Sequence, residues 1–352
     1  MRAEARRCRD HIPSDLHTEI LIWLPVKSLV RFTSVSKSWQ SLLKDSTFIA
    51  SRRATTPSCG KQSLLVKKRL RHRGGPLKIC MSTHYDSNHF NYENLENMEL
   101  EILPENLGPL HSFYTCHELV CLVYNDFNVI LIWNPSIQKF ITVPTPRYLG
   151  VSTSGFGFDP KTNDYKVIWT YFGSYTVEMF SLNTRSRRKI NYEIPCFPFA
   201  HKQICINGVI YWIDGIVKYI LGFDLGDDKF WHISLCAELS DAFNSLELAE
   251  LRESICIIQY RDRIGFKDKQ LCSIWVMEEP GVFVKLITIS SAECFGRVLC
   301  FKTNGEILLA SLDKRLVYSY DPRNSTLSYC GRISIDDYYL ELNTYVESLV
   351  LL

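Results

Sequence analysis

The chain has 352 residues, which is enough for about two domains. Hydrophobic residues make up 46% of the sequence and charged residues 22%, an ordinary balance for a folded globular protein. The 40 Lys and Arg against 38 Asp and Glu leave a net charge of +2, so no overall field draws nucleic acid or an anionic membrane to the chain. We therefore expect no nucleic-acid partner and no membrane partner.

The first segment, residues 1–11, is a basic tail that lacks the apolar core of a signal peptide. No stretch reaches the roughly 18 consecutive apolar residues of a membrane-spanning helix. The 13 cysteines are odd in number, are scattered from Cys8 to Cys330 and form no Cys-x-x-Cys pair. These features predict free thiols in a reducing compartment, the cytoplasm and/or the nucleus.

Residues 12–50 carry more apolar side chains than a segment of about 40 residues buries by itself, because chains of that size seldom fold without a disulfide, a metal or a partner. Leu16, Ile20 and Leu24 recur at helical spacing while Leu21 lies on the opposite side, so the first helix is apolar nearly all round. Pro25 ends this helix, and a second helix begins directly after it. A third apolar group predicts another short helix: Val35, Trp39, Leu42 and Leu43.

The pattern of this segment is Ile12-Pro13-x-Asp15-Leu16-x-x-Glu19-Ile20-Leu21-x-x-Leu24-Pro25-Val26-Lys27-Ser28-Leu29-x-Arg31-Phe32, then Val35-x-Lys37-Ser38-Trp39-x-x-Leu42. It resembles an F-box, the helical motif with which the F-box family holds the Skp-type adaptor of cullin-RING ubiquitin ligases. Ser36 departs from the pattern, since relatives often carry Cys there, and we expect little effect. The resemblance implies adaptor contacts at Ile12, Pro13, Leu16, Ile20, Leu21, Leu24, Pro25, Val26, Leu29, Val35 and Trp39. The alternative is a three-helix cap that packs on the rest of its own chain.

Beyond residue 50 the pattern changes. Residues 51–62 are a polar connector, and from 63 to 352 short β-branched and aromatic runs alternate with clusters of Asn, Asp, Gly and Pro, which predicts an all-β domain. Residues 237–251 are predicted to hold a short helix. The predicted strands are 119–124, 129–133, 140–143, 165–170, 176–182, 209–213, 219–223, 256–260, 271–276, 284–289, 307–310 and 316–320.

An aromatic residue near a polar turn recurs along the β domain. The aromatic positions are Trp133, Phe180, Phe223, Trp275 and Tyr318, at spacings of 47, 43, 52 and 43 residues. Periods of about 40 to 50 residues are typical of four-stranded propeller blades. With residues 63–103 as a further blade, we predict a propeller-like domain of about six blades, closed by residues 346–352 pairing with the first blade. A β-sandwich of the same strands is the alternative.

The β region also carries family-like motifs: Cys116-His117-Glu118-Leu119-Val120-Cys121-Leu122, Ile132-Trp133-Asn134-Pro135-Ser136, residues 155–167 (Gly-Phe-Gly-Phe-Asp-Pro-Lys-Thr-Asn-Asp-Tyr-Lys-Val), Asn207-Gly208-Val209-Ile210-Tyr211-Trp212 and residues 220–225. They are similar to the F-box-associated domain of the large plant F-box family, over most of residues 110–350. That family usually has a Ser-Cys-Asn-Gly-type turn where this chain has Thr115-Cys116-His117-Glu118. Because Gly takes a positive φ cheaply, the sequence leaves the geometry of this turn open.

One dense basic run, residues 67–75 (Lys-Lys-Arg-Leu-Arg-His-Arg-Gly-Gly), is interpreted as a solvated hairpin loop between two strands of the first blade. The alternative is recognition by nuclear import receptors or by an acidic partner, because clustered like charges favour an exposed loop.

No sequence motif predicts catalysis or a cofactor. The chain has no Gly-x-Ser-x-Gly, no phosphate-binding Gly-Lys-Ser/Thr loop and no His-Glu-x-x-His. Cys116, His117 and Cys121 have no second ligand pair at metal-like spacing, so we expect buried thiols and a surface His there, with no metal site. Gly155-x-Gly157 precedes a strand and a turn, so it does not predict a dinucleotide site.

We therefore expect an α+β multidomain protein: a small N-terminal three-helix F-box (12–50), a linker (51–62) and a propeller-like domain (63–352). The expected function is a non-catalytic substrate-recognition subunit of a Skp-cullin-F-box ubiquitin ligase, in which the F-box docks on the adaptor and the β domain binds an unknown client. The alternatives are a propeller scaffold or small-ligand receptor outside any ligase and, with less support, an inactive relative of the propeller oxidases. No client-binding residue is assigned, because Arg147, Tyr148, His201, Tyr260, Arg261 and Phe266 fit plain solvent-facing connections equally well.

Overall fold

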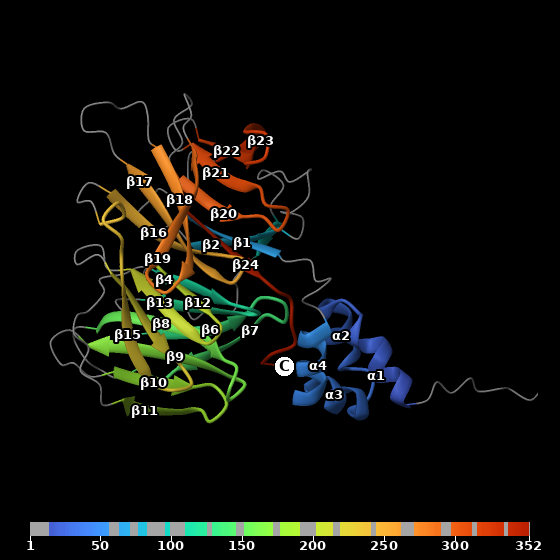
Figure 1. The fold of residues 1–352 in the computed structure, drawn as a ribbon. Helices are drawn as coiled ribbons and strands as arrows, with labels where there is room; N and C mark the ends of the chain where they lie inside the picture. The colour runs from blue at the N-terminus through green and yellow to red at the C-terminus, as the bar shows by residue number, and fades with distance from the viewer. Residues whose placement is uncertain are drawn as a thin grey trace, which may run out of the picture.

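A computed structural model describes residues 14–55, 63–70, 77–82, 96–98, 110–124, 129–145, 151–171, 177–190, 202–213, 219–240, 244–261, 271–289, 297–311, 315–333 and 337–351. Within them, a small group of helices lies against one side of a large β domain (Figure 1). None of the described helices is long and apolar enough to span a membrane.

Four short helices form the N-terminal helical unit: α1 (Ser14–Ile22), α2 (Val26–Phe32), α3 (Lys37–Lys44) and α4 (Ser46–Thr55). The predicted break at Pro25 is confirmed, since α1 ends at Ile22 and α2 begins directly after the proline. Helix α3 begins after Ser36, whose side-chain oxygen accepts a hydrogen bond from the backbone amide of Trp39 at 3.2 Å. Serine at this departure from the F-box pattern therefore caps the helix.

The three predicted helices correspond to α1, α2 and α3, and a fourth helix, α4, follows them and extends into the segment predicted to be a connector. Asp45 starts this helix, since its Oδ1 accepts hydrogen bonds from the backbone amides of Thr47, at 2.8 Å, and Phe48, at 3.2 Å. Phe48 is buried in the core of the helical unit. A capping Asp before a buried aromatic residue is the sequence signal that would have predicted this helix.

The described strands of the β domain form four-stranded antiparallel sheets. Five of these sheets are blades of consecutive strands, one fewer than the six predicted from the sequence. The remaining four-stranded sheet is composite and joins β1, β2 and β3 to β24. The strands of the composite sheet are β24 (Asp337–Tyr345), β1 (Ser63–Leu70), β2 (Leu77–Ser82) and β3 (Glu96–Met98).

The five consecutive blades are bounded as follows. They are β4 (Leu110–Cys116), β5 (Leu119–Tyr124), β6 (Val129–Asn134) and β7 (Lys139–Val143); β8 (Val151–Asp159), β9 (Asp164–Tyr171), β10 (Val177–Ser181) and β11 (Ser186–Ile190); β12 (Gln203–Ile206), β13 (Val209–Ile213), β14 (Tyr219–Asp224) and β15 (Lys229–Ser234); β16 (Asn244–Leu251), β17 (Ser254–Arg261), β18 (Leu271–Glu279) and β19 (Val282–Ile289); and β20 (Arg297–Phe301), β21 (Ile307–Ser311), β22 (Leu316–Asp321) and β23 (Thr326–Arg332).

The repeat found in the sequence corresponds to one position in the blades. Trp133, Phe180, Phe223, Trp275 and Tyr318 lie on β6, β10, β14, β18 and β22, which are the third strands of the five consecutive blades. The first strands of neighbouring blades contact one another: β24 with β4, β4 with β8, β8 with β12, β12 with β16, and β20 with β24. The predicted propeller architecture is therefore confirmed, and the β-sandwich alternative is excluded.

Three local predictions are wrong. The ring is closed by β24, which pairs with β1 from Ser63↔Tyr345 to Leu70↔Asp337, whereas residues 346–351 form no strand. Residues 244–251 are strand β16 instead of part of a helix, because they pair along their whole length with β17. Residues 67–70 of the basic run belong to β1, where they pair with β2 and β24. The rest of that run lies outside the described residues.

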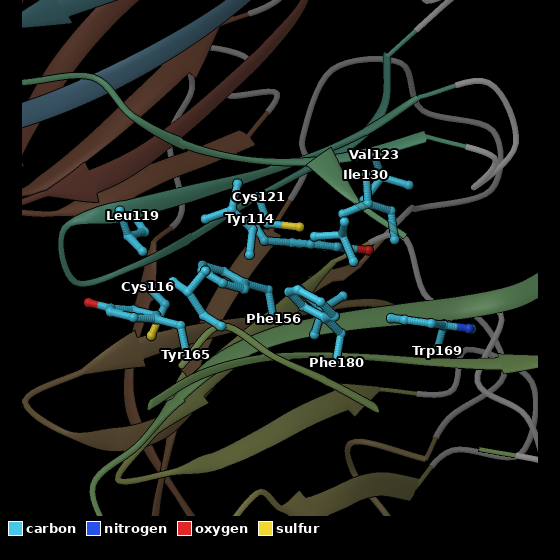
Figure 2. Close-up of a cluster of buried hydrophobic side chains, with 14 residues drawn as sticks. Tyr114, Cys116, Leu119, Cys121, Val123, Ile130, Phe156, Tyr165, Trp169 and Phe180 are labelled. Atoms are coloured by element: carbon cyan, nitrogen blue, oxygen red, sulfur yellow. The ribbon is translucent and has the colours of Figure 1, made fainter. Parts of the chain in front are cut away.

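Apolar side chains between adjacent blades make up the core of the β domain. Figure 2 shows Tyr114 and Cys121 of the β4–β7 blade facing Phe156, Tyr165 and Phe180 of the β8–β11 blade. The rings of Phe156 and Tyr165 are stacked with their centroids 5.7 Å apart. The middle strand β5 is buried on both faces, since every one of its residues is buried.

Candidate functional site

The helical unit has a core of its own that includes three of the residues predicted to contact the adaptor. Leu21, Val26 and Leu29 are at most 2% exposed and pack with Leu43 and Phe48. These side chains are no longer available for direct contact with a partner. Their position fixes α1 and α2 relative to α3 and α4.

A second group of apolar side chains remains exposed on the same unit. Leu16, Ile20 and Trp23 are 45%, 49% and 68% exposed, and their spacing places them along one face of α1 and the turn that follows it. Val35, in the turn between α2 and α3, is 63% exposed. A small helical unit whose core is already filled thus keeps a row of large apolar side chains in water, which is typical of a docking surface.

The other predicted contacts have mixed positions. Pro25 is exposed, while Leu24 and Trp39 are partly buried. The indole ring of Trp39 packs edge-on against Phe32, with ring centroids 5.3 Å apart, and lies 5.9 Å from the ring of His17. Ile12 and Pro13 lie outside the described residues. We name Leu16, Ile20, Trp23, Pro25 and Val35 the exposed helical face.

The helical unit is anchored on the β domain through Arg53 of α4. Its guanidinium forms an ion pair with the Glu118 carboxylate, with Nε donating to Oε1 at 2.7 Å, and Glu118 is almost fully buried. The guanidinium also lies over the ring of Phe158, 4.5 Å from the centroid, and Nη2 donates to the hydroxyl oxygen of Tyr165 at 3.3 Å. We name Arg53 and these three partners the Arg53 anchor.

The pKa of Arg53 reflects this setting. Burial lowers it, but the nearby Tyr165 hydroxyl and the Glu118 carboxylate outweigh burial and raise the pKa above its ordinary value. The guanidinium is therefore held charged at the interface between the helical unit and the blades.

Glu118 occupies the turn in which the sequence departs from the related family. His117 takes a φ of +50°, and Cys116 pairs with Leu119 across the turn, so β4 and β5 are still joined by a tight two-residue connection. The loss of Gly therefore leaves the turn intact. Glu118, which stands in place of that Gly, also supplies the carboxylate that Arg53 binds.

Two comparisons with known families bear on the chain as a whole. The "F-box associated beta propeller domain" family matches residues 68–335, and the "F-box domain" family matches residues 10–50. The first of these matches covers more than half of the chain. The chain belongs to the family with an F-box associated beta propeller domain.

Relatives of this chain occur in Arabidopsis thaliana. A putative F-box protein is 28% identical over 278 residues, covering 76% of this chain and 68% of the relative. An F-box/kelch-repeat protein is 25% identical over 323 residues, covering 85% of each chain. Among solved structures, a chain in the crystal structure of a nidogen/laminin complex superposes with a TM-score of 0.50 at 10% identity, covering 82% of this chain and all of the other, a likeness of fold alone.

A central cavity of about 500 Å³ lies where the first strands of several blades meet. Its wall combines charged and amide side chains, among them Lys202, Gln203, Glu250 and Asn343. Burial, together with the nearby Glu253 carboxylate, raises the pKa of Glu250. Gln203 is already occupied, since its side-chain amide exchanges two hydrogen bonds with the backbone of Phe156.

Three buried cysteines of the propeller, Cys121, Cys256 and Cys272, are poor nucleophiles. Burial raises the pKa of the Cys256 and Cys272 thiols to about 12, and it raises that of Cys121 further. A thiol is a nucleophile or a metal ligand as its thiolate, so these groups are inert at neutral pH. Among the described residues, no cluster of three or more His, Cys, Asp or Glu side chains could hold a metal ion.

The loop residues considered as client contacts are nearly all undescribed. Arg147, Tyr148, His201 and Phe266 lie outside the described residues, as does the side chain of Arg261. Tyr260 is buried, and its hydroxyl accepts a hydrogen bond from the backbone amide of Val298 at 3.0 Å. Tyr260 is therefore a structural residue of the blade.

Proposed function

We propose that this protein is a substrate-recognition subunit of a Skp-cullin-F-box ubiquitin ligase and that the exposed helical face binds the Skp-type adaptor. The observation that carries the proposal is the exposure of Leu16, Ile20 and Trp23 on a helical unit whose core is already filled, by its own helices together with Ile137 and Leu349. An isolated apolar row of this kind is stabilised when a partner covers it. The F-box match at residues 10–50 supports a Skp-type adaptor as that partner.

The proposal divides the predicted adaptor contacts into two roles. The exposed helical face supplies direct contacts, whereas Leu21, Val26 and Leu29 act from inside by holding α1 and α2 in place. Burying the exposed part of one large apolar side chain contributes about 1 kcal/mol, at roughly 25 cal/mol per Å². Several such side chains together can hold a complex without an ion pair.

The receptor forms no bond itself in this function. The propeller holds a client protein in the same assembly as a ubiquitin-conjugating enzyme, which raises the effective concentration of a client lysine near the reactive thioester. The protein acts in the cytoplasm and/or the nucleus, with no cofactor. The client stays undefined.

The test is adaptor binding by the double variant Leu16→Ala/Ile20→Ala. We expect a loss of about 2 kcal/mol, which is roughly thirty-fold in Kd. The matched control is Val284→Ala/Leu286→Ala on β19, where the two side chains are 43% and 61% exposed. Adaptor titrations by calorimetry should separate the two double variants. Equal affinities for wild type and the Leu16/Ile20 variant would refute the assignment of this face.

The second candidate is a propeller scaffold or small-ligand receptor outside any ligase. It draws support from the helical unit being packed on the blades, through the Arg53 anchor and through Ile137, which lies in the core of the helical unit. The central cavity is its candidate ligand site. It predicts that purified protein never binds a Skp-type adaptor, even with the exposed helical face intact.

A further inference from the structure

A segment from the far end of the sequence lies within the helical unit. Residues 346–351, which we name the closing segment, follow β24 and run beside α2 and α4 (Figure 1). Leu349 is fully buried and belongs to the same apolar cluster as Leu21, Val26 and Leu29. Leu351 packs against that cluster as well. The core of the F-box is therefore built from both ends of the described chain.

A buried polar network holds the closing segment in place. Asn134, at the end of β6, is fully buried, and its Nδ2 donates to the Ser348 carbonyl oxygen at 3.1 Å, to Ser348 Oγ at 3.2 Å and to the Val350 carbonyl oxygen at 2.8 Å. Asn134 Oδ1 accepts hydrogen bonds from the Tyr345 hydroxyl at 2.8 Å and the backbone amide of Ser136 at 2.9 Å. When the amide nitrogen and the carbonyl oxygen of a buried side chain are both hydrogen-bonded in this way, the chain segment that they contact is held in one conformation.

The same segment is continuous with the strand that closes the propeller. β24 pairs with β1 up to the Ser63↔Tyr345 partners, and the closing segment begins at the next residue. The backbone amide of Val346 donates to the carbonyl oxygen of His117 at 3.2 Å, in the turn that supplies Glu118 to the Arg53 anchor. Closure of the ring and completion of the helical core therefore depend on one stretch of chain.

We infer that the closing segment is a positioning element of the adaptor-docking unit, which reaches its binding-competent form only when β24 has paired with β1. This inference rests on the proposed function, because adaptor docking is the activity that the segment would support. It deepens that function by making adaptor binding depend on a correctly closed propeller. A chain whose ring is open would present an incomplete F-box and would be excluded from the ligase.

The test compares Leu349→Ala with the matched control Leu248→Ala. Leu248 is equally buried, but it lies on β16 in a cluster that contains no residue of the helical unit or of β24. Hydrogen exchange is measured at the amides of α1, α2 and α3 in the full chain without adaptor, followed by titration with adaptor. Removing a core side chain raises local opening in the unit that it supports. We expect Leu349→Ala to speed exchange in these helices at least tenfold and to weaken adaptor binding at least tenfold, while Leu248→Ala changes both less than twofold.

Equal exchange rates in the helices of the two variants would overturn the inference. If Leu349→Ala does not fold, Ser348→Ala takes its place, since it removes only the hydroxyl that accepts from Asn134 and from the Val350 amide. A severalfold rise in helical exchange for Ser348→Ala supports the inference, and unchanged exchange overturns it. Failure of wild-type protein to bind the adaptor would refute the proposed function alone, because the exchange comparison uses no adaptor.

Discussion

Replacing Arg53 by Met should destabilise the protein by about 3 kcal/mol, because it leaves a buried carboxylate without its partner. The side chain of Glu118 is 3% exposed and that of Arg53 is 28% exposed. Breaking a buried ion pair by removing one partner costs about 3–5 kcal/mol. We take the lower end because the partly exposed Arg53 position lets water reach the carboxylate once the guanidinium is gone.

The assay is urea unfolding at neutral pH, followed by tryptophan fluorescence, with the free energy of unfolding and the m-value compared between variants. Arg188→Met is the matched control, since Arg188 pairs with Asp228 at 2.7 Å but its side chain is 51% exposed. Exposed pairs contribute about 0–1 kcal/mol, so we expect the control to lose less than about 1 kcal/mol.

A double-mutant cycle identifies the cause. Arg53→Met combined with Glu118→Gln should cost at least about 1.5 kcal/mol less than the two single losses added together, because the neutral amide no longer needs a counter-charge. Two results would refute the reasoning: an Arg53→Met loss no larger than that of Arg188→Met, or strict additivity in the double variant.

Three further predictions concern the blades. Gly157→Ala should lose about 1–3 kcal/mol in urea unfolding, because an added Cβ would lie 2.6 Å from Cys205 Sγ; stability equal to wild type would contradict this. Tyr345→Phe removes the hydrogen bond to Asn134 and should lower the free energy of unfolding by about 1–2 kcal/mol, which a lowered melting temperature would report. An unchanged melting temperature would contradict this. Burial opposes ionisation of Asp159, but hydrogen bonds from a buried ammonium and a hydroxyl lower its pKa below its ordinary value. Its contribution is therefore present above that ordinary value and is lost as pH falls through the lowered pKa, so Asp159→Asn should flatten the acid limb of a stability–pH curve below about pH 4.

The sequence predicted some strands better than others because burial differs across a blade. Every predicted strand coincides with an observed one, and most are the second or third strand of a sheet, such as β5 and β13. Those strands are covered on both faces and read as continuous apolar runs. The outermost strand β11 is Ser-Arg-Arg-Lys-Ile, largely exposed, and its composition gives no strand signal.

The candidate site was predicted in outline, but the role of each residue was not. Helical spacing placed Leu16 and Ile20 together on α1, as observed, yet it could not separate them from Leu21, because a helix that is apolar all round has no distinguishable partner face. The Arg53 anchor and the closing segment were missed, since both join residues far apart in sequence. The one sequence signal near the Arg53 anchor was the turn at residues 117 and 118, where a positive φ was expected and where His117 has one.

Under the proposed function, anchoring α4 on the turn between β4 and β5 would affect which client lysines the ligase modifies. With the helical unit held at Glu118 and Phe158, a client bound to such a receptor would not swing freely on a tether. Its orientation towards the catalytic end of the assembly would then be set once, when it binds. The choice of lysine would follow from where the residue sits on the client's surface, and the surrounding amino acids would matter little.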